Sequence, residues 1–262
     1  MSEDSDYGVD SPQNSLDCMR GYQYITENPN WMQNVLFVAV CNLIPFIGPI
    51  LVTGYQFEVA DSLLHPKNRR NYVDFTFDRF QPYLLRGLWP FLATLIASMV
   101  MSTIIVPVIF LSFFVMAMIG AAAGNDAGGV VALLGMVMVF LLIMLLSMGT
   151  VIVMTPLSLR AGYSQDLATA FDFGFIKDFV RRMWKETLIV TLFLMVSSIP
   201  LMLAGLLLCG IGIYFAAAIL LMAQAHLYDY QLYAIYLSRG GMPIPRKVEA
   251  TQEDDEDEND DE

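Results

Sequence analysis

The chain has 262 residues, of which 56% are hydrophobic, and its mean hydropathy is +0.55. Soluble globular proteins are typically about 45–50% apolar, so this composition argues against a soluble domain. The net charge of −12 also argues against nucleic-acid binding, because contacts to phosphates need Lys and Arg.

The negative charge lies at the two ends of the chain. Residues 1–17 hold five acidic residues and no basic one, and residues 248–262 hold ten acidic residues and no basic one. Like charges at this density repel each other, so the pattern predicts acidic disordered tails over residues 1–20 and 241–262. The C-terminal tail either solvates the protein or binds a basic protein partner.

The first apolar segment covers residues 35–57 and is interrupted by Pro45, Gly48 and Pro49. Its 23 residues are enough for one membrane span of about 20 residues. Two prolines four residues apart remove backbone donors and clash with the preceding turn, so a re-entrant hairpin is equally compatible. Both alternatives place a helix break at Pro45–Pro49.

The centre of the chain has almost no charge. Between Arg86 and Arg160 the only charged residue is Asp126. This predicts one span over residues 88–123, a turn at 124–129 and a second span over residues 130–157. A helix of 30 or more residues exceeds the bilayer core of about 30 Å, so the first of these spans must tilt, kink at Pro107 or protrude.

Two further apolar segments follow, at residues 187–208 with Pro200 inside, and at residues 213–237 with a Tyr-rich end. A tight turn is expected at 209–212. Together the segments predict an all-α fold: a polytopic membrane helical bundle of hairpins with amphipathic interfacial helices.

Basic residues predict the orientation in the membrane. Lys and Arg occur in the loops 58–86 and 158–186 and again after residue 238, whereas the turns 124–129 and 209–212 contain none. Short cytoplasmic loops carry an excess of Lys and Arg. We therefore expect a multi-pass protein of the cell (inner) membrane with its long loops and C-terminus in the cytoplasm.

An internal repeat precedes the apolar hairpins. When residues 80–89 and 175–184 are aligned on their tryptophans, Phe80 matches Phe175, Arg86 matches Arg181 and Trp89 matches Trp184. A weaker copy precedes the first apolar segment and includes Trp31. The repeat predicts three hairpin units, at about residues 21–64, 72–160 and 164–238, within a membrane domain of residues 21–240. By analogy the first unit is re-entrant, with the N-terminus inside.

The lead-in at residues 171–186 has apolar residues at helical spacing and a basic opposite face that includes Arg181, Arg182 and Lys185. This predicts a helix lying in the membrane interface. Trp31, Trp89 and Trp184 would lie at headgroup depth, with Arg86 and the three basic residues just named toward anionic lipid. The alternative is an amphipathic helix packed on the bundle.

The run from Ile44 to Tyr55, the aromatic lead-ins and the Leu208-Cys-Gly-Ile-Gly212 turn resemble the domain of unknown function 4013 family of prokaryotic multipass membrane proteins. That family is similar to the membrane domain accompanying some glycerophosphodiester phosphodiesterases. The resemblance implies an inner-membrane protein and brings no assigned activity or site residues.

Polar residues inside the apolar segments are few. His226 and Asp229 lie three apart, which places them on one face of an α-helix, either as interfacial anchors or as a proton or metal site. We find no nucleophile motif, P-loop or paired carboxylates in the membrane segments, and expect no enzyme activity, cofactor or metal. The expected function is membrane organisation or an accessory (scaffold) role in the lipid bilayer. The alternative is a small transporter or channel acting as a homo-oligomer.

Overall fold

The computed structural model describes residues 15–64, 73–122, 124–208 and 210–245, and these residues form helices joined by short connections. The elements in chain order are α1 (Arg20–Glu27), α2 (Trp31–Cys41), α3 (Ile47–Leu64), the 3-10 helix η1 (Phe77–Arg79), α4 (Phe80–Ala122), α5 (Gly124–Ser164), α6 (Leu167–Ala170), α7 (Phe173–Leu207), α8 (Gly212–Gln224), the π-helix η2 (Ala225–Gln231) and α9 (Leu232–Ser238). The predicted all-α fold is confirmed.

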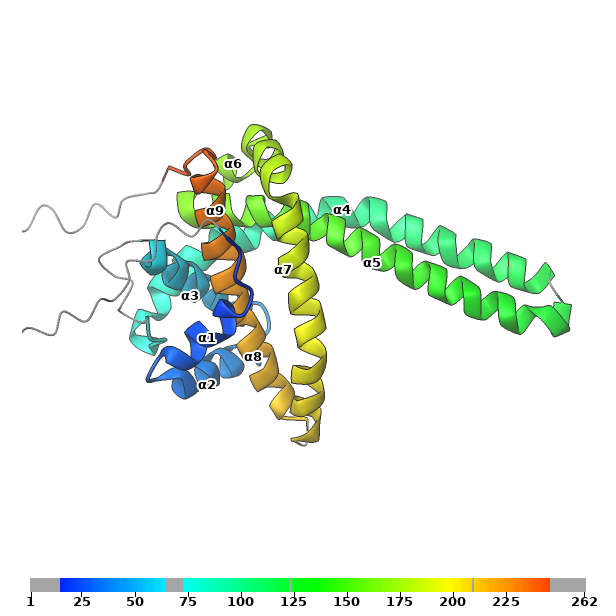
Figure 1. Ribbon diagram of the computed structural model, residues 1–262, viewed down its shortest axis with the longest axis horizontal. Helices are drawn as coiled ribbons and strands as arrows, with labels where there is room; N and C mark the ends of the chain where they lie inside the picture. Colours follow the sequence, from blue (N-terminus) through cyan, green and yellow to red (C-terminus); the bar gives the residue numbers. More distant parts are fainter. Residues whose placement is uncertain (1–14, 65–72, 123, 209, 246–262) are drawn as a thin grey trace, which may run out of the picture.

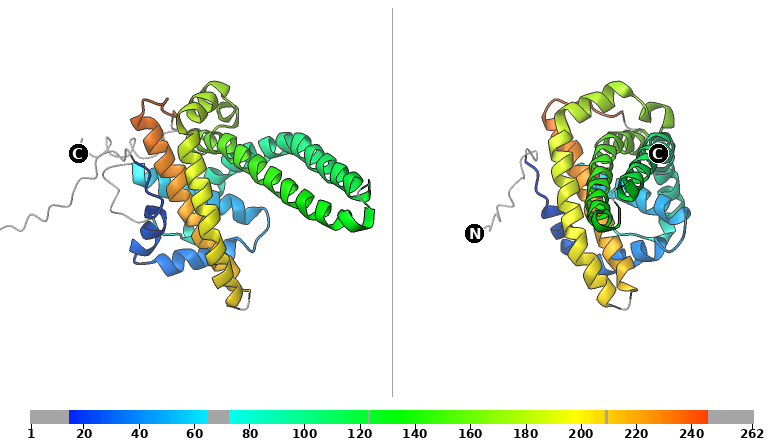
Figure 2. Two further views of the ribbon diagram at one scale, coloured as in Figure 1. Left: turned by 45° about the vertical axis from the view of Figure 1, so that its right-hand side comes forward. Right: turned by 90° about the vertical axis from the view of Figure 1, so that its right-hand side faces the viewer.

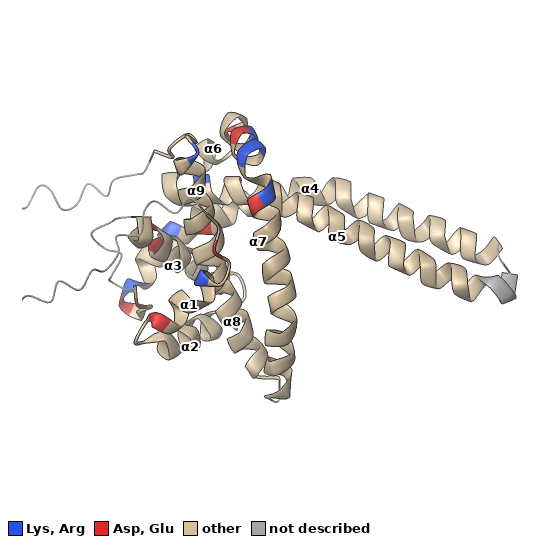
Figure 3. Cartoon of the chain, in the orientation of Figure 1, with Lys and Arg blue, Asp and Glu red and all other residues tan. Residues whose placement is uncertain are grey.

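Helices α4 and α5 form an antiparallel hairpin that projects far from the remaining helices (Figure 1). We call the projecting part the arm, and the rest of the molecule the body. With 43 and 41 residues, the two helices are each about 60–65 Å long. Between Arg86 and Arg160 the sequence has one charged residue, Asp126 near the start of α5, and the coloured part of the arm in Figure 3 shows no Lys, Arg, Asp or Glu. Its outward side chains, such as Phe110 and Phe114, are exposed, as expected of a surface that faces lipid.

Three of the described helical stretches are long and apolar enough to cross a membrane: Phe77–Ala122, Gly128–Ser164 and Phe173–Leu207. The protein is therefore a helical membrane protein. The fifth apolar segment, at residues 213–237, is not one regular helix, because α8 gives way to η2 and then to α9. Its second half is rich in Tyr and largely buried in the body, so that half packs against protein rather than lipid.

The body has an aromatic core. Tyr55, Phe75 and Tyr83 contact one another with ring centroids 5.1–5.9 Å apart. Two glycines let α3 and α4 cross closely. A Cβ on Gly54 would lie 1.9 Å from the Tyr83 carbonyl oxygen, and one on Gly87 would lie 1.9 Å from the Ile50 carbonyl oxygen. This crossing fixes the base of the arm against the first unit.

The first apolar segment is a helix, a turn and a second helix. Helix α2 has 11 residues, too few for a span of about 20 residues, and α3 has 18 and contains Glu58 and Asp61. The turn at residues 42–46 exposes apolar side chains, with Phe46 78% exposed. Its backbone hydrogen bonds stay internal, for instance from the Gly48 nitrogen to the Ile44 oxygen at 3.0 Å. The segment is thus a helical hairpin with its turn at residues 42–46, and its re-entry into the membrane stays a prediction.

The lead-ins predicted as separate interfacial helices are continuous with the spans. Helix α4 already begins at Phe80, and α7 at Phe173. The first part of α7 crosses one end of the molecule before the helix bends into its long apolar part (Figure 2, right). Phe175, Phe179 and Met183 are fully buried, whereas Phe173 and Trp184 are exposed. Much of the apolar face of residues 171–186 therefore packs on the bundle, and contact of this helix with the membrane interface stays a prediction.

Three predicted boundaries also differ. Helix α5 begins at Gly124, so the described turn is shorter than residues 124–129. Within the tails predicted at 1–20 and 241–262, Asp17 exchanges backbone hydrogen bonds with the Gln231 side chain, and Ile244 is buried with its nitrogen bonded to the Tyr233 hydroxyl. Partners on the π-helix and α9 therefore order residues 15–20 and 241–245. The acidic stretches at 1–14 and 246–262 lie outside the described residues.

Candidate functional site: a hydroxyl-lined cavity with one carboxylate

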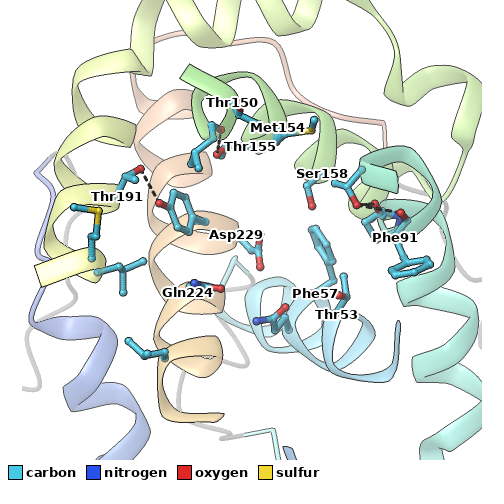
Figure 4. Close-up of a pocket in the computed structure, with 18 of the residues that line it drawn as sticks. Thr53, Phe57, Phe91, Thr150, Met154, Thr155, Ser158, Thr191, Gln224 and Asp229 are labelled. Atoms are coloured by element: carbon cyan, nitrogen blue, oxygen red, sulfur yellow. Dashed lines mark hydrogen bonds between the residues drawn. The ribbon is translucent and has the colours of Figure 1, made fainter. Parts of the chain in front are cut away.

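A cavity of about 520 Å³ lies at the base of the arm, where α4 and α5 enter the body (Figure 4). Helices α3, α4, α5, α7 and α8 and the π-helix all contribute to its wall. Ligand-binding cavities are typically about 300–1,000 Å³, apolar over most of their lining, with a few placed polar groups. The volume of this cavity falls in that range.

Much of the polar lining consists of hydroxyl groups that already donate to their own helices. Thr53 donates to the Pro49 carbonyl at 2.8 Å, and Thr94 donates to the Pro90 carbonyl at 2.7 Å. Four more hydroxyls donate to carbonyls three or four residues earlier in their own helices: those of Thr150, Thr155, Thr191 and Ser198. Such bonds satisfy the hydroxyl proton without a partner from another helix, and the oxygen lone pairs remain able to accept.

Asp229 supplies the carboxylate of the cavity. It lies in the π-helix, and its side chain points into the space between η2, α3 and α5 (Figure 4). Its backbone oxygen accepts a hydrogen bond of 2.8 Å from the Tyr163 hydroxyl. Among the described residues, no side chain donates a hydrogen bond to its carboxylate or forms a salt bridge with it. The carboxylate is thus available to a ligand.

Tyr228, the neighbour of Asp229, connects the π-helix to α7. Its hydroxyl lies 2.8 Å from the Thr191 hydroxyl, which donates to the Thr187 carbonyl at 2.7 Å. Because the Thr191 proton is used in that second bond, Tyr228 is the donor in the first. Gln56 makes a similar connection from α3, donating to the Leu221 carbonyl at 2.6 Å. These contacts hold the wall around Asp229 in place.

The structure does not bring His226 and Asp229 together. His226 is buried on the opposite side, where its ring lies 5.1 Å from that of Tyr24 and its Nδ1 lies 3.2 Å from Gln231 Nε2. The pairing expected from the sequence assumed α-helical spacing. Residues 225–231 form a π-helix with hydrogen bonds from i to i+5, so residues three apart no longer share a face.

The three tryptophans have different surroundings. Trp31 begins α2 and is 37% exposed, Trp89 is half-buried in α4, and Trp184 is 46% exposed in α7 with the Lys185 ammonium 5.5 Å from its ring centroid. Their placement at headgroup depth remains a prediction, because no membrane is part of the structure.

The basic residues predicted to face lipid differ in their contacts. Arg86 forms a salt bridge with Asp61 of α3 at 3.2 Å, and Arg182 forms one with Asp178 at 2.9 Å. Arg181 and Lys185 are exposed. Arg182 also donates to the Arg239 carbonyl at 2.7 Å. Arg86 and Arg182 thus link elements of the body, and the other two remain accessible to an anionic surface.

The helix break lies slightly earlier than expected. Pro45 lies in the turn, whereas Gly48 and Pro49 lie in the first turn of α3, where proline is tolerated. A Cβ on Gly48 would lie 1.8 Å from the Cys41 carbonyl oxygen. Gly48 thus permits the close approach of α2 and α3, and Phe46, with a φ of 65°, makes the reversal.

Comparison with known proteins places the chain in a family. A sequence model of the family described as "Protein of unknown function (DUF4013)" matches residues 37–210. The chain belongs to this family. No curated protein and no solved structure matches. The membership agrees with the sequence resemblance, whereas the association with glycerophosphodiester phosphodiesterases stays an expectation.

The DUF4013 match covers only part of the cavity. Thr53, Thr94, Thr155 and Thr191 lie within it, and Asp229 lies 19 residues beyond its end. The carboxylate is therefore a feature of this chain that the family match does not describe.

Sequence reasoning missed the cavity and a second polar cluster in this DUF4013 protein. The Asp74 carboxylate accepts hydrogen bonds of 2.7–3.0 Å from the side-chain amides of Asn28, Asn30 and Asn34, and the Asn34 oxygen accepts from the Phe75 nitrogen. Burial of Asp74 opposes its charged form, but the three amides outweigh it and lower the pKa of Asp74 below its usual value. The cluster fixes the entry to α4.

A signal for the cavity was present in the sequence. Thr155 and Ser158 lie three residues apart at the end of an apolar stretch, which places them on one face of α5. The described residues include no group of three or more His, Cys, Asp or Glu side chains that could hold a metal ion.

Proposed function

We propose that this DUF4013 protein is a non-enzymatic inner-membrane protein that organises the bilayer or assists other membrane components as an accessory or scaffold. The main observation that supports the proposal is the surface of the arm. The arm presents uncharged helix surface longer than the bilayer core of about 30 Å, and its outward side chains are exposed. Such a surface suits lateral contact with lipid, with neighbouring helices or with a second copy.

The proposed orientation places the charged end of the body in the cytoplasm. Charged side chains gather at the start of α7, after α9 and around α3 and η1 (Figure 3). This distribution supports the positive-inside assignment. The acidic C-terminal stretch would then lie in the cytoplasm, where a basic protein partner could bind it.

Lateral association can be tested with the full-length protein in proteoliposomes. Copies labelled at Cys18, in a Cys41→Ala/Cys209→Ala background, are mixed as energy-transfer donors and acceptors. We expect transfer above the level of randomly distributed copies. The Phe110→Ala/Phe114→Ala variant should reduce it, because both side chains are exposed on the arm. Ile199→Ala, at an exposed position on α7, is the matched control and should leave it unchanged.

Transfer at the random level over all protein-to-lipid ratios would contradict self-association through the arm. A reduction by Ile199→Ala as large as that by the arm variant would show that the arm has no special role.

The alternative is a small oligomeric transporter or channel, and the hydroxyl-lined cavity is the observation that favours it. Charge for coupling is scarce, since in the part of the chain that the structure describes Asp229 is the only acidic residue of the lining and no basic residue lines it. A flux assay in the same proteoliposomes separates the two functions. Saturable flux of a solute, absent from protein-free vesicles, would overturn the scaffold proposal.

A further inference from the structure

The cavity at the base of the arm has a one-sided chemistry. Among the described residues its lining contains one carboxylate, from Asp229, and no Lys, Arg or His. The hydroxyls of Thr53 and Thr155 donate to carbonyls of their own helices, at 2.8 Å each. What these groups offer a ligand is therefore oxygen lone pairs. Ser158 and Gln224 in the wall can also donate, but the Asp229 carboxylate and the threonine lone pairs complement a ligand that brings hydrogen-bond donors and a positive charge.

The remainder of the wall complements hydrocarbon. Leu194, Met195 and Leu220 contribute aliphatic surface, and Phe57 and Phe91 contribute aromatic rings. Aromatic rings attract cations that approach their faces within about 6 Å. Figure 4 shows Phe57 on the far side of the space into which Asp229 points. Charge, acceptors and aromatic surface thus meet in one cavity.

We propose that this cavity is a binding site for an organic ammonium ion, whose charged head contacts Asp229 and whose alkyl part lies against α7 and α8. The inference goes beyond the proposed function, because it holds whether the protein organises the membrane or carries solutes. A single carboxylate disfavours a divalent metal, which takes several oxygen ligands. A carboxylate ligand is repelled by Asp229.

Three probes that share an alkyl chain and differ in their polar head group test the site: hexylammonium, hexanol and hexanoate. Burial raises the pKa of Asp229 to about 8, so probe binding to the full-length protein in nanodiscs is measured by calorimetry above that pH, where the carboxyl is ionised. Empty nanodiscs correct for partition into lipid. We expect hexylammonium to bind at least about tenfold more tightly than hexanol, a preference typical of one desolvated charged hydrogen bond. Hexanoate should not bind. Hexanol or hexanoate binding as tightly as hexylammonium would overturn the proposal. This part of the test needs no variant.

Variants then locate the site. Asp229→Asn keeps the shape of the side chain and removes its charge, so the preference for hexylammonium over hexanol should fall to within about threefold. Asp78→Asn, at an exposed position on η1, is the matched control and should retain the full preference. Thr155→Val removes one acceptor oxygen and should weaken hexylammonium binding a fewfold. Full preference in Asp229→Asn would place the site elsewhere and overturn the assignment.

Discussion

Helices α4 and α5 run through both the arm and the body, but their side chains differ in what they contact in the two regions. Along α5, Leu145 is 68% exposed in the arm, whereas Leu159 is completely buried in the body. The arm meets its surroundings with apolar side chains, while the body pairs its charges internally, as in the Arg86–Asp61 and Arg160–Asp172 salt bridges. The body is thus held together by specific contacts between side chains, whereas the arm presents apolar side chains suited to contact with lipid.

The largest expected difference between the body and the arm is in how much a glycine substitution changes the free energy of unfolding. Gly87→Leu should abolish the folded state, because even a Cβ there would lie 1.9 Å from a backbone oxygen of α3, and backbone atoms cannot move aside cheaply. Gly149→Leu, on α5, should change the free energy of unfolding by less than about 1 kcal/mol, since nothing lies within 4 Å of a Cβ there. Thermal unfolding in detergent, followed by circular dichroism, measures both. Cooperative unfolding of Gly87→Leu near the wild-type temperature would contradict the close crossing.

The second expected difference between the body and the arm is in the effect of the same substitution, Leu to Ala, at two positions on α5. Leu159→Ala should lower the free energy of unfolding by about 2–5 kcal/mol, as cavity-forming substitutions in packed cores do. Leu145→Ala should change it by less than about 0.5 kcal/mol, because its side chain is exposed. Denaturation with a chemical denaturant in detergent micelles gives both values. Equal effects would mean that the arm is packed as tightly as the body, for example through contacts with a second copy.

The sequence predicted the arm better than the body. The uncharged stretch from Arg86 to Arg160 was enough to predict two adjacent membrane helices, because hydrophobicity over about 20 residues is a local property. The lead-ins were harder, since the periodicity of residues 171–186 is the same whether their apolar face meets lipid or, as here, Tyr236.

Tertiary contacts account for what could not be predicted. The amides that bind Asp74 lie 40–46 residues away, and no local pattern links them. Nothing in residues 225–231 marks a π-helix, yet that local geometry separates His226 from Asp229 and aims the carboxylate into the cavity. The cavity itself depends on hydroxyls from separate helices, each of which looks like an ordinary polar residue in its own span.

A smaller effect concerns the Asp74 cluster, which belongs to the body and has no counterpart in the described arm. Because the folded protein lowers the pKa of Asp74, the stabilisation is present above its ordinary value of 3.8 and is lost as the pH falls through the lower folded value. The free energy of unfolding should therefore fall more steeply below about pH 4 in the wild type than in Asp74→Asn. Asp78→Asn should follow the wild type, and a wild-type slope in Asp74→Asn would show that the amides do not stabilise the charged form.

The smallest expected effect on the free energy of unfolding concerns backbone strain. The body has a non-glycine residue with positive φ in its turn at residues 42–46, whereas the described arm has none. Phe46 has a φ of 65°, a conformation that costs an ordinary residue roughly 1–2 kcal/mol. Phe46→Gly removes that cost but adds freedom to the unfolded chain, worth about 0.5–1 kcal/mol, so it should raise the free energy of unfolding by about 0.5 kcal/mol. Phe46→Ala keeps the strain and, because the Phe46 side chain is 78% exposed, loses almost no contact within the protein. The glycine variant should therefore exceed the alanine variant in thermal stability, and equal stability of the two would show that the turn relaxes without a positive φ.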